Sequence, residues 1–153
     1  MAGSAYAVAK ARLVTKLDAH ATLTSKVTYG DAEANGAREL VMVLASPGEA
    51  DEIWATIGNQ ARDEEFDIVV LCEVVRPGDS QQEATERCET LFAAVETQVR
   101  DWLNTRTSPD QTAATAGITG AQIVRVRRDE FPEPEGRGAS TTAVVRISAR
   151  KKP

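Results

Sequence analysis

Apolar residues recur every three or four positions in two segments of the chain, a spacing that predicts amphipathic helices. The longer segment, 80–104, opens with Ser80 and Glu83 in the order of a capping box. A shorter segment, 5–20, follows the same spacing after Ser4, its expected N-cap. The apolar stripe of the longer segment consists of Ala84, Cys88, Leu91, Val95, Val99 and Trp102. One apolar stripe per helix predicts that both helices lie on a sheet.

Apolar runs bounded by turn residues predict the strands. The expected strands are 27–31, 39–45, 51–58, 66–76, 118–128 and 141–150. Segment 66–76 is apolar on both faces, which is typical of a central strand. Residues 105–117 lack an apolar period, which predicts a loop. Residues 129–139 hold two prolines and two glycines among charged residues, which predicts a mobile hairpin tip, and residues 151–153 predict a frayed tail.

The expected order is one helix, four strands, one helix and two strands. Short turns between consecutive strands favour antiparallel hairpins, and two one-sided helices need a surface to cover. The pattern therefore predicts a two-layer α+β fold: a mostly antiparallel sheet, two amphipathic helices packed on one face, and a long protruding β-hairpin. A length of 153 residues favours a single domain over 1–153. Apolar Val69, Leu71 and Val75 on the other sheet face would suit a neighbouring subunit.

Composition narrows the class of protein. The chain is 42% hydrophobic and 27% charged, which is typical of a globular protein. No apolar run approaches the roughly 20 residues of a membrane-spanning helix, and the first residues lack the apolar block of a secretory signal, so no membrane partner is expected. Cys72 and Cys88 are too few for a disulfide framework and stand at apolar positions, which predicts two buried thiols.

Charge is spread unevenly along the chain. Residues 1–120 carry ten basic and 19 acidic side chains, a net charge of −9, whereas residues 121–153 carry eight basic and four acidic ones, a net charge of +4. An acidic body followed by a basic hairpin favours head-to-tail contact between copies or a basic surface that faces an anion. Solvated arginines on an exposed strand are the plainer interpretation.

Five arginines of the last two expected strands are the main candidates for binding. Arg125 and Arg127 share one strand face, Arg128 follows on the other, and Arg146 and Arg150 share a face of the next strand. A basic ribbon of this kind can contact a nucleic-acid backbone. No aromatic residues alternate with the arginines to stack on bases, and the net charge of −5 opposes strong DNA binding. Solvated arginines, contact with another subunit, and a DNA-conducting lumen stay open as alternatives.

Three further residues complete the candidate interface with subunits or with a tail tube. Trp54 points to the opposite face of its strand from Ile53, and its side chain lies either in the core or in an interface. Phe131 and Arg137 lie in the expected tip 129–139.

The residues that carry chemistry form no recognisable site. The acidic run 63–67 lacks a partner motif and is expected to be a solvated strand entrance, although an ion shared between subunits stays open. The chain has a single histidine, His20, which excludes most catalytic triads that use a second histidine. It also has no glycine-rich phosphate loop and no nucleophile elbow. We therefore expect no catalytic residue, no metal ligand and no cofactor, and expect that the protein is not an enzyme.

The order of these features resembles the tail terminator (tail completion) proteins of long-tailed, non-contractile bacteriophages, including the lambda type. The resemblance covers roughly residues 5–150 and rests on order, not on a signature motif. The features are the N-terminal helix, Val27-Thr28-Tyr29-Gly30-Asp31, a strand with Ile53-Trp54, Arg62-Asp63-Glu64-Glu65 before the strand 66–75, the helix from Glu83 to Arg100, and a closing hairpin with a charged tip. Segment 105–117 departs from the pattern, because a short turn of the Leu-Gly-Gly type commonly follows the long helix in that family.

The resemblance implies a hexameric ring that caps the tail tube protein, stops tail growth and presents a surface to head-completion or connector proteins. It also implies a place in the tail or neck of the virion, assembly in the host cytoplasm, and DNA passing through the lumen. In such a ring the tip 129–139 and the basic strands are expected to carry assembly, the tip by ordering on the tail tube. Two alternatives stay open: another ring protein of the neck, such as a head–tail connector or head-closure protein, and a basic-ribbon nucleic-acid-binding module.

Overall fold

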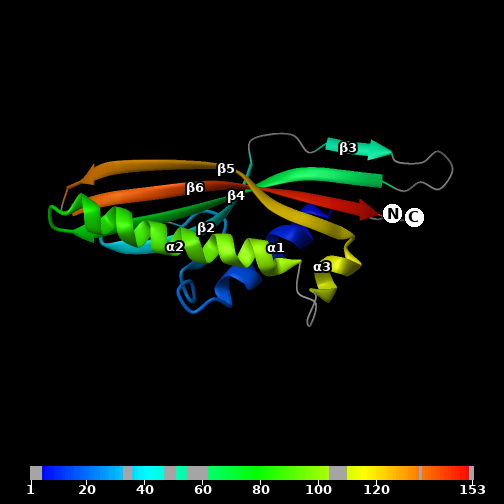
Figure 1. The fold of residues 1–153 in the computed structure, drawn as a ribbon, viewed down its shortest axis with the longest axis horizontal. Helices are drawn as coiled ribbons and strands as arrows, with labels where there is room; N and C mark the ends of the chain where they lie inside the picture. The colour runs from blue at the N-terminus through cyan, green and yellow to red at the C-terminus, as the bar shows by residue number, and fades with distance from the viewer. Residues whose placement is uncertain are drawn as a thin grey trace.

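The computed structural model shows two layers, a sheet and a set of helices on one of its faces (Figure 1). It describes residues 5–32, 36–46, 51–54, 62–103, 110–134 and 136–151. The helices are α1 (Tyr6–Asp18), α2 (Gln81–Trp102) and α3 (Gln111–Thr115). The strands are β1 (Val27–Tyr29), β2 (Arg38–Ala45), β3 (Asp51–Trp54), β4 (Arg62–Pro77), β5 (Ile118–Glu133) and β6 (Gly136–Lys151). The predicted two-layer α+β class is confirmed.

The six strands form one sheet in the order β1-β2-β4-β6-β5, with β3 paired to the first residues of β4. The pairing of β1 with β2 is parallel, and the other pairings are antiparallel. β4 is central, as its two apolar faces predicted, because β2 and β3 pair along one side of it and β6 along the other. β5 and β6 form a long hairpin that reaches the same end of the molecule as β4 (Figure 1).

The helices cover one face of the sheet, so the residues of β4 alternate between buried and partly exposed. Its residues Phe66, Ile68 and Val70 are at most 4% exposed, whereas Val69 and Leu71 point to the opposite face and are partly exposed. The buried apolar residues that α1 and α2 add are Ala9, Leu13, Leu17, Ala84, Cys88, Leu91, Phe92, Ala94, Val95, Val99 and Trp102. These belong to a single core cluster with the inner residues of β2, β4 and β6. The apolar stripe predicted for the long helix is therefore its contact with the sheet.

The start of α2 follows the predicted capping signal. Ser80 is the N-cap, and its Oγ accepts a hydrogen bond from the backbone N–H of Glu83 at 3.3 Å. For α1 the structure assigns Ala5 as the N-cap residue without a side-chain cap, and the predicted cap Ser4 lies outside the described residues. The second half of the predicted strand 51–58 also lies outside them.

The prediction of a loop over 105–117 is wrong in its second half, which contains α3. Asp110 is the N-cap of this helix and accepts from the backbone N–H of Ala113 at 3.0 Å. The same carboxylate binds Arg12 of α1 and the indole N–H of Trp102 of α2. These contacts fix the short helix against two others, although it has no apolar period that could have predicted it.

The ladder continues through most of the segment 129–139 that was predicted to be a hairpin tip, so the tip is shorter than predicted. β5 continues to Glu133 and β6 begins at Gly136. The ladder extends this far because glycine allows close approach. A Cβ at Gly138 would collide with the ring of Phe131, and a Cβ at Gly136 would collide with the carbonyl of Arg76. Lys151, predicted to be frayed, pairs with Arg62 in the β4–β6 ladder, and residues 152–153 lie outside the described part.

Both cysteines are free and buried, as predicted. Cys72 of β4 and Cys88 of α2 face each other across the two layers, and burial raises the pKa of both thiols. Because the thiolate is the reactive form, we expect neither thiol to react with a thiol-specific reagent at pH 8 in the native protein. Both should react once denaturant unfolds the chain, which a colorimetric thiol count with and without denaturant measures. A native count of one or two would contradict the described packing.

Among the helices that the structure describes, none is both long enough and apolar enough to cross a bilayer.

Candidate interaction surface

The sheet face opposite the helices carries the side chains that the fold leaves available for contact, and we call it the open face. Residues directly opposite one another on paired strands point to the same face, so the pairing defines its rows. Leu44, Val69 and Val144 form one row across β2, β4 and β6, and Met42 with Leu71 forms part of the next. We call these five residues the aliphatic patch. Four of them are partly exposed and Met42 is 4% exposed.

Ion pairs border the aliphatic patch toward the start of β4. Arg146 of β6 lies opposite Asp67 of β4, and its Nε lies 3.0 Å from Oδ1 of that carboxylate and 3.7 Å from Oε1 of Glu65. Arg150 lies opposite Asp63, with 3.5 Å between Nε and Oδ1. Two arginines of the hairpin are therefore neutralised by the acidic strand beside them.

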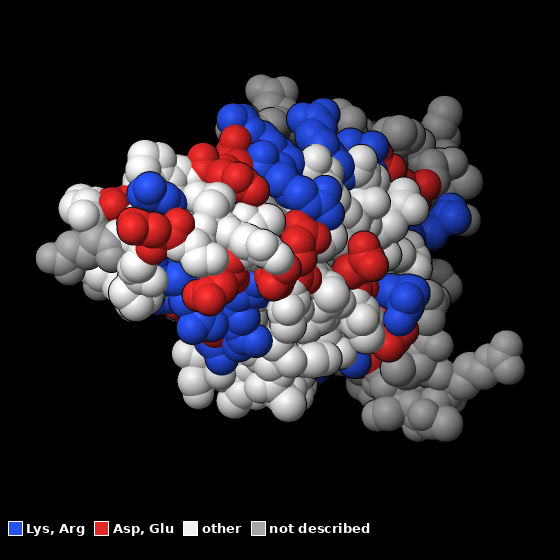
Figure 2. Space-filling model, turned by 60° about the vertical axis from the view of Figure 1, so that its left-hand side comes forward, with Lys and Arg blue, Asp and Glu red and all other residues white. Residues whose placement is uncertain are grey.

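A second charged group borders the patch toward the hairpin turn. Arg38 of β2 binds Glu73 of β4 at 2.9 Å and Glu133 of β5 at 3.5 Å. The hydrogen bond to Glu73 is the main reason why the pKa of Arg38 is raised, and it outweighs the opposing effect of burial. The patch therefore lies between two sets of paired charges. On the side of the molecule drawn in Figure 2, Lys and Arg likewise lie beside Asp and Glu.

The structure divides the predicted arginines between the two faces of the sheet. Arg125 and Arg127 share one face, as predicted, and this is the open face. Arg127 binds Asp129 on the same strand at 3.1 Å. Arg125 is exposed and has no ion pair among the residues that the structure describes. Arg128 points to the helix side, where its Nε lies 2.6 Å from Oε1 of Glu89 of α2.

The remaining predicted interface residues have separate places. Phe131 is half-buried on the open face against Gly138, and Arg137 donates to the carbonyl of Gly136 at 3.3 Å. Both lie within the β5–β6 ladder. Trp54 belongs to β3, which pairs it with Arg62, and its side chain lies outside the described part.

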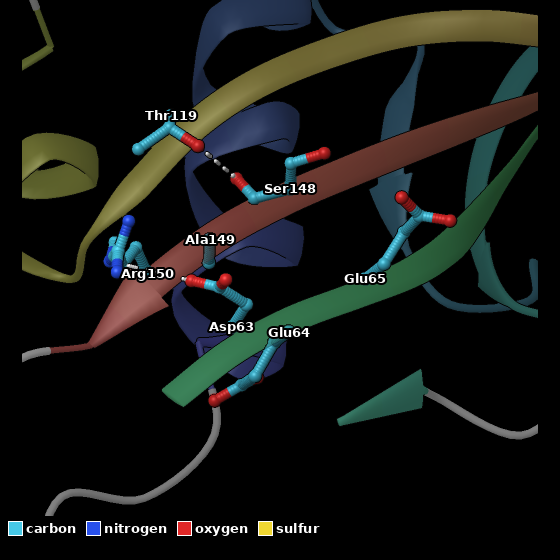
Figure 3. A pocket seen from close by; sticks show the side chains of 7 residues that line it. All are labelled: Asp63, Glu64, Glu65, Thr119, Ser148, Ala149 and Arg150. Carbon is cyan, nitrogen blue, oxygen red and sulfur yellow. Dashed lines mark hydrogen bonds and ion pairs between the residues drawn. The ribbon is translucent and has the colours of Figure 1, made fainter. Parts of the chain in front are cut away.

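The acidic run 63–67 does not converge on one point. A hollow of about 470 Å³ is lined by Asp63, Glu64, Glu65, Thr119, Ser148, Ala149 and Arg150. Figure 3 shows Asp63 turned toward Arg150, while Glu64 points away from both. Glu64 is 3% exposed, and its Oε2 accepts from the backbone N–H of Ala5 at the start of α1. Within the described residues no three His, Cys, Asp or Glu side chains are grouped as metal ligands.

No protein-family model matches this chain, and no curated protein matches it. Function is therefore inferred from the open face and its borders.

Sequence reasoning missed the ion pairs between the acidic body and the basic hairpin. The uneven charge of the sequence suggested contact between copies, but the fold places the two charged segments side by side in one sheet. A usable signal was present: Asp63 and Asp67 are four residues apart, and so are Arg146 and Arg150. Equal spacing at the ends of two expected strands fits an antiparallel pair with opposite charges on one face.

Proposed function

We propose that this chain is a structural virion protein that forms a ring, caps a phage tail tube and presents a surface for joining the head. The aliphatic patch on the open face is the observation that carries the proposal. Three neighbouring strands contribute to it, and no described helix covers it. A fold of two layers leaves this face without a covering layer of its own, so another molecule can pack on it, and in a ring that molecule is the next copy of the chain.

The charged borders of the patch would set the direction of this contact. A ring needs a heterologous interface, in which one surface of a subunit meets a different surface of the next. Paired charges at both ends of an apolar patch add little affinity but penalise the wrong orientation. The order of features that resembles the tail terminators agrees with this arrangement. The tail tube protein, the head-completion proteins and the DNA that passes through the lumen are the partners in this proposal, with no cofactor and no catalytic step.

A nucleic-acid-binding module is less well supported. Affinity for a phosphate backbone comes from basic side chains that replace counterions. Arg128, Arg146 and Arg150 already have carboxylate partners within the chain. A different ring protein of the neck would use the same open face and differs from a terminator only in its partners.

The proposal predicts a rise in mass with concentration. In light scattering of the full chain over a wide concentration range, we expect a shift from the monomer mass of 16.4 kDa toward six times that mass, with rings visible in negative-stain images. Leu71→Asp should abolish the large species, because a carboxylate would be desolvated in the contact between subunits. The expected loss is at least about tenfold in the apparent association constant.

Tyr29→Asp is the matched control. Tyr29 is 55% exposed on β1, away from the open face, and the same new charge there should leave the mass distribution unchanged. Both variants should keep the wild-type circular dichroism spectrum. A wild-type chain that stays monomeric at the highest concentration, or equal effects of the two variants, would overturn the proposed ring.

A further inference from the structure

β5 is an edge strand with a long free side. Within the described part of the chain, β6 is the strand that pairs with it, and its other side has no neighbour (Figure 1). From position 124 to 132 its residues are exposed apart from Val126 and Phe131, which are partly buried. A free edge offers backbone N–H and C=O groups that a further strand can pair with, and proteins usually block edges of this length.

The features that block pairing stand at the two ends of this edge, not at its centre. A bulge interrupts the register between Ile123 and Arg125, and Pro132 lacks a backbone N–H. Between them, residues 125–131 pair without interruption with β6, from Val144 to Gly138. The segment 125–131 is therefore a regular strand with its outer side open.

The charge of this segment changes sign at its centre. Arg125, Arg127 and Arg128 are followed by Asp129, Glu130 and, beyond the proline, Glu133. Charges on an edge usually prevent it from pairing with its own copy, because like charges meet. Here an antiparallel pair of two copies brings the basic half of one strand against the acidic half of the other.

We propose that β5 binds β5 of a second copy of this chain, antiparallel, around a two-fold axis at Asp129. Opposed residues of an antiparallel pair point to the same face, so the helices of both copies lie on one side of the joined sheet. In this register Arg128 lies opposite Glu130 of the partner subunit, and Arg125 lies opposite Glu133 of the partner subunit. Arg128 also binds Glu89, and Glu133 also binds Arg38, within each chain, so these two charges are shared between an internal and an external partner.

Other registers are less favourable. A two-fold axis at Arg128 would place this arginine opposite Arg128 of the partner subunit, and the two like charges would repel each other. In the register at Asp129, this aspartate lies opposite Asp129 of the partner subunit. Each of the two carboxylates already has a cation beside it, because Nε of Arg127 lies 3.1 Å from Oδ2 of Asp129 on the same strand. Arg127 in turn lies opposite Phe131 of the partner subunit, whose ring can accept a cation.

A cysteine placed on the axis tests the contact. Opposed residues of an antiparallel pair have Cα atoms about 4.5–5.5 Å apart, which suits a disulfide. Asp129→Cys in the full chain should therefore form a covalent dimer under mild oxidation at micromolar concentration. The two native thiols do not interfere, because Cys72 and Cys88 are buried. The yield is measured by non-reducing gel electrophoresis.

Gln122→Cys is the control on the same strand. Gln122 is exposed, but in the proposed register the two copies of this position lie about 46 Å apart along the strands. It should give at least about tenfold less covalent dimer than Asp129→Cys. Equal yields from the two variants would mean random collision and would overturn the proposal.

A charge exchange tests the register. With cysteine at 129, Arg125→Glu should lower the yield about fivefold or more, because it places a glutamate opposite Glu133 of the partner subunit. Adding Glu133→Arg to the same chain should restore the yield. Because Glu133 also binds Arg38 within its own chain, Glu133→Ala with cysteine at 129 is the control for the loss of that ion pair. Arg125 is a suitable position because it has no ion pair among the described residues, so its replacement leaves the fold intact. No recovery in the exchanged variant would contradict this register.

This contact goes beyond the proposed ring and is tested separately. It uses the edge of the sheet and gives a dimer, whereas the ring uses the open face and gives a larger species. Leu71→Asp should leave the Asp129→Cys dimer unchanged, so failure of either proposal is distinguishable from failure of the other.

Discussion

Replacing Asp110 by alanine is expected to lower the free energy of unfolding by about 2–4 kcal/mol. Its carboxylate accepts from the indole N–H of Trp102 at 2.9 Å, from Nε of Arg12 at 3.0 Å and from the backbone N–H of Ala113. Trp102 is 1% exposed, so its N–H would lose its partner in a dry environment. The loss of the α3 cap adds to this cost. A thermal melt should show a fall of roughly 5–15 °C.

Two matched variants separate the contributions of this carboxylate. Arg12→Ala removes the ion pair but leaves the buried indole satisfied, and since the arginine side chain is 34% exposed its loss should cost less than about 1 kcal/mol. Asp110→Asn keeps an acceptor oxygen and should fall between the two. If Asp110→Ala is as stable as Arg12→Ala, the hydrogen bond to the indole of Trp102 does not contribute to the free energy of unfolding.

The same site predicts a pH dependence. Burial acts to raise the pKa of Asp110, but the hydrogen bonds from Trp102, from the backbone of Ala113 and from Arg12 prevail, so the pKa lies below its ordinary value of 3.8. A depressed pKa means that the carboxylate contributes its full stability above about pH 4 and loses it as the pH falls through the folded-state value. The difference in unfolding free energy between wild type and Asp110→Asn should therefore narrow as the pH falls from 5 to 2.5 in denaturant titrations.

The fold could be predicted from the sequence wherever periodicity is strong. The stripe from Ala84 to Trp102 and the two apolar faces of 66–76 each have one structural solution, a one-sided helix and a central strand. The capping pair Ser80 and Glu83 placed the start of α2 to within one residue. These elements depend on local pattern and burial, which a sequence contains.

The failures lie where contacts distant in sequence decide the structure. Segment 111–115 is helical because Asp110 binds residues of α1 and α2, which no local pattern reveals. Residues 129–139 have the prolines and glycines of a loop, yet Gly136 and Gly138 serve close packing within a ladder. The same composition can mark a mobile turn or a tight strand contact, and only the paired strand distinguishes them.

The candidate site could be predicted only in part. Which arginines share a strand face was predicted correctly, because alternation along a strand is a local property. Their partners could not be predicted, since the register of β4 against β6 joins residues 79 positions apart in the case of Asp67 and Arg146. Val69 and Leu71 of the aliphatic patch were predicted to suit a neighbouring subunit, but the ion pairs on both sides of the patch were not.

The last prediction uses the two faces of β4 to separate stability from assembly. Ile68 is fully buried under the helices, whereas Leu71 is partly exposed in the aliphatic patch. Ile68→Ala should cost about 2–5 kcal/mol, because it removes buried methyl groups and leaves a cavity. Leu71→Ala removes less buried area and should cost less than about 1.5 kcal/mol in the monomer. Urea unfolding at low protein concentration measures both values.

At higher protein concentration, Leu71→Ala should weaken association more than Ile68→Ala does, although it costs less stability in the monomer. If the aliphatic patch is buried between copies of the chain, Leu71→Ala weakens association while the monomer stays stable, so its mass distribution shifts to smaller species. Ile68→Ala should lower stability at every concentration, because its contacts are within the subunit. Equal costs at low concentration would mean that the open face is packed as tightly as the core in the monomer, which would remove the surface on which the proposed ring depends.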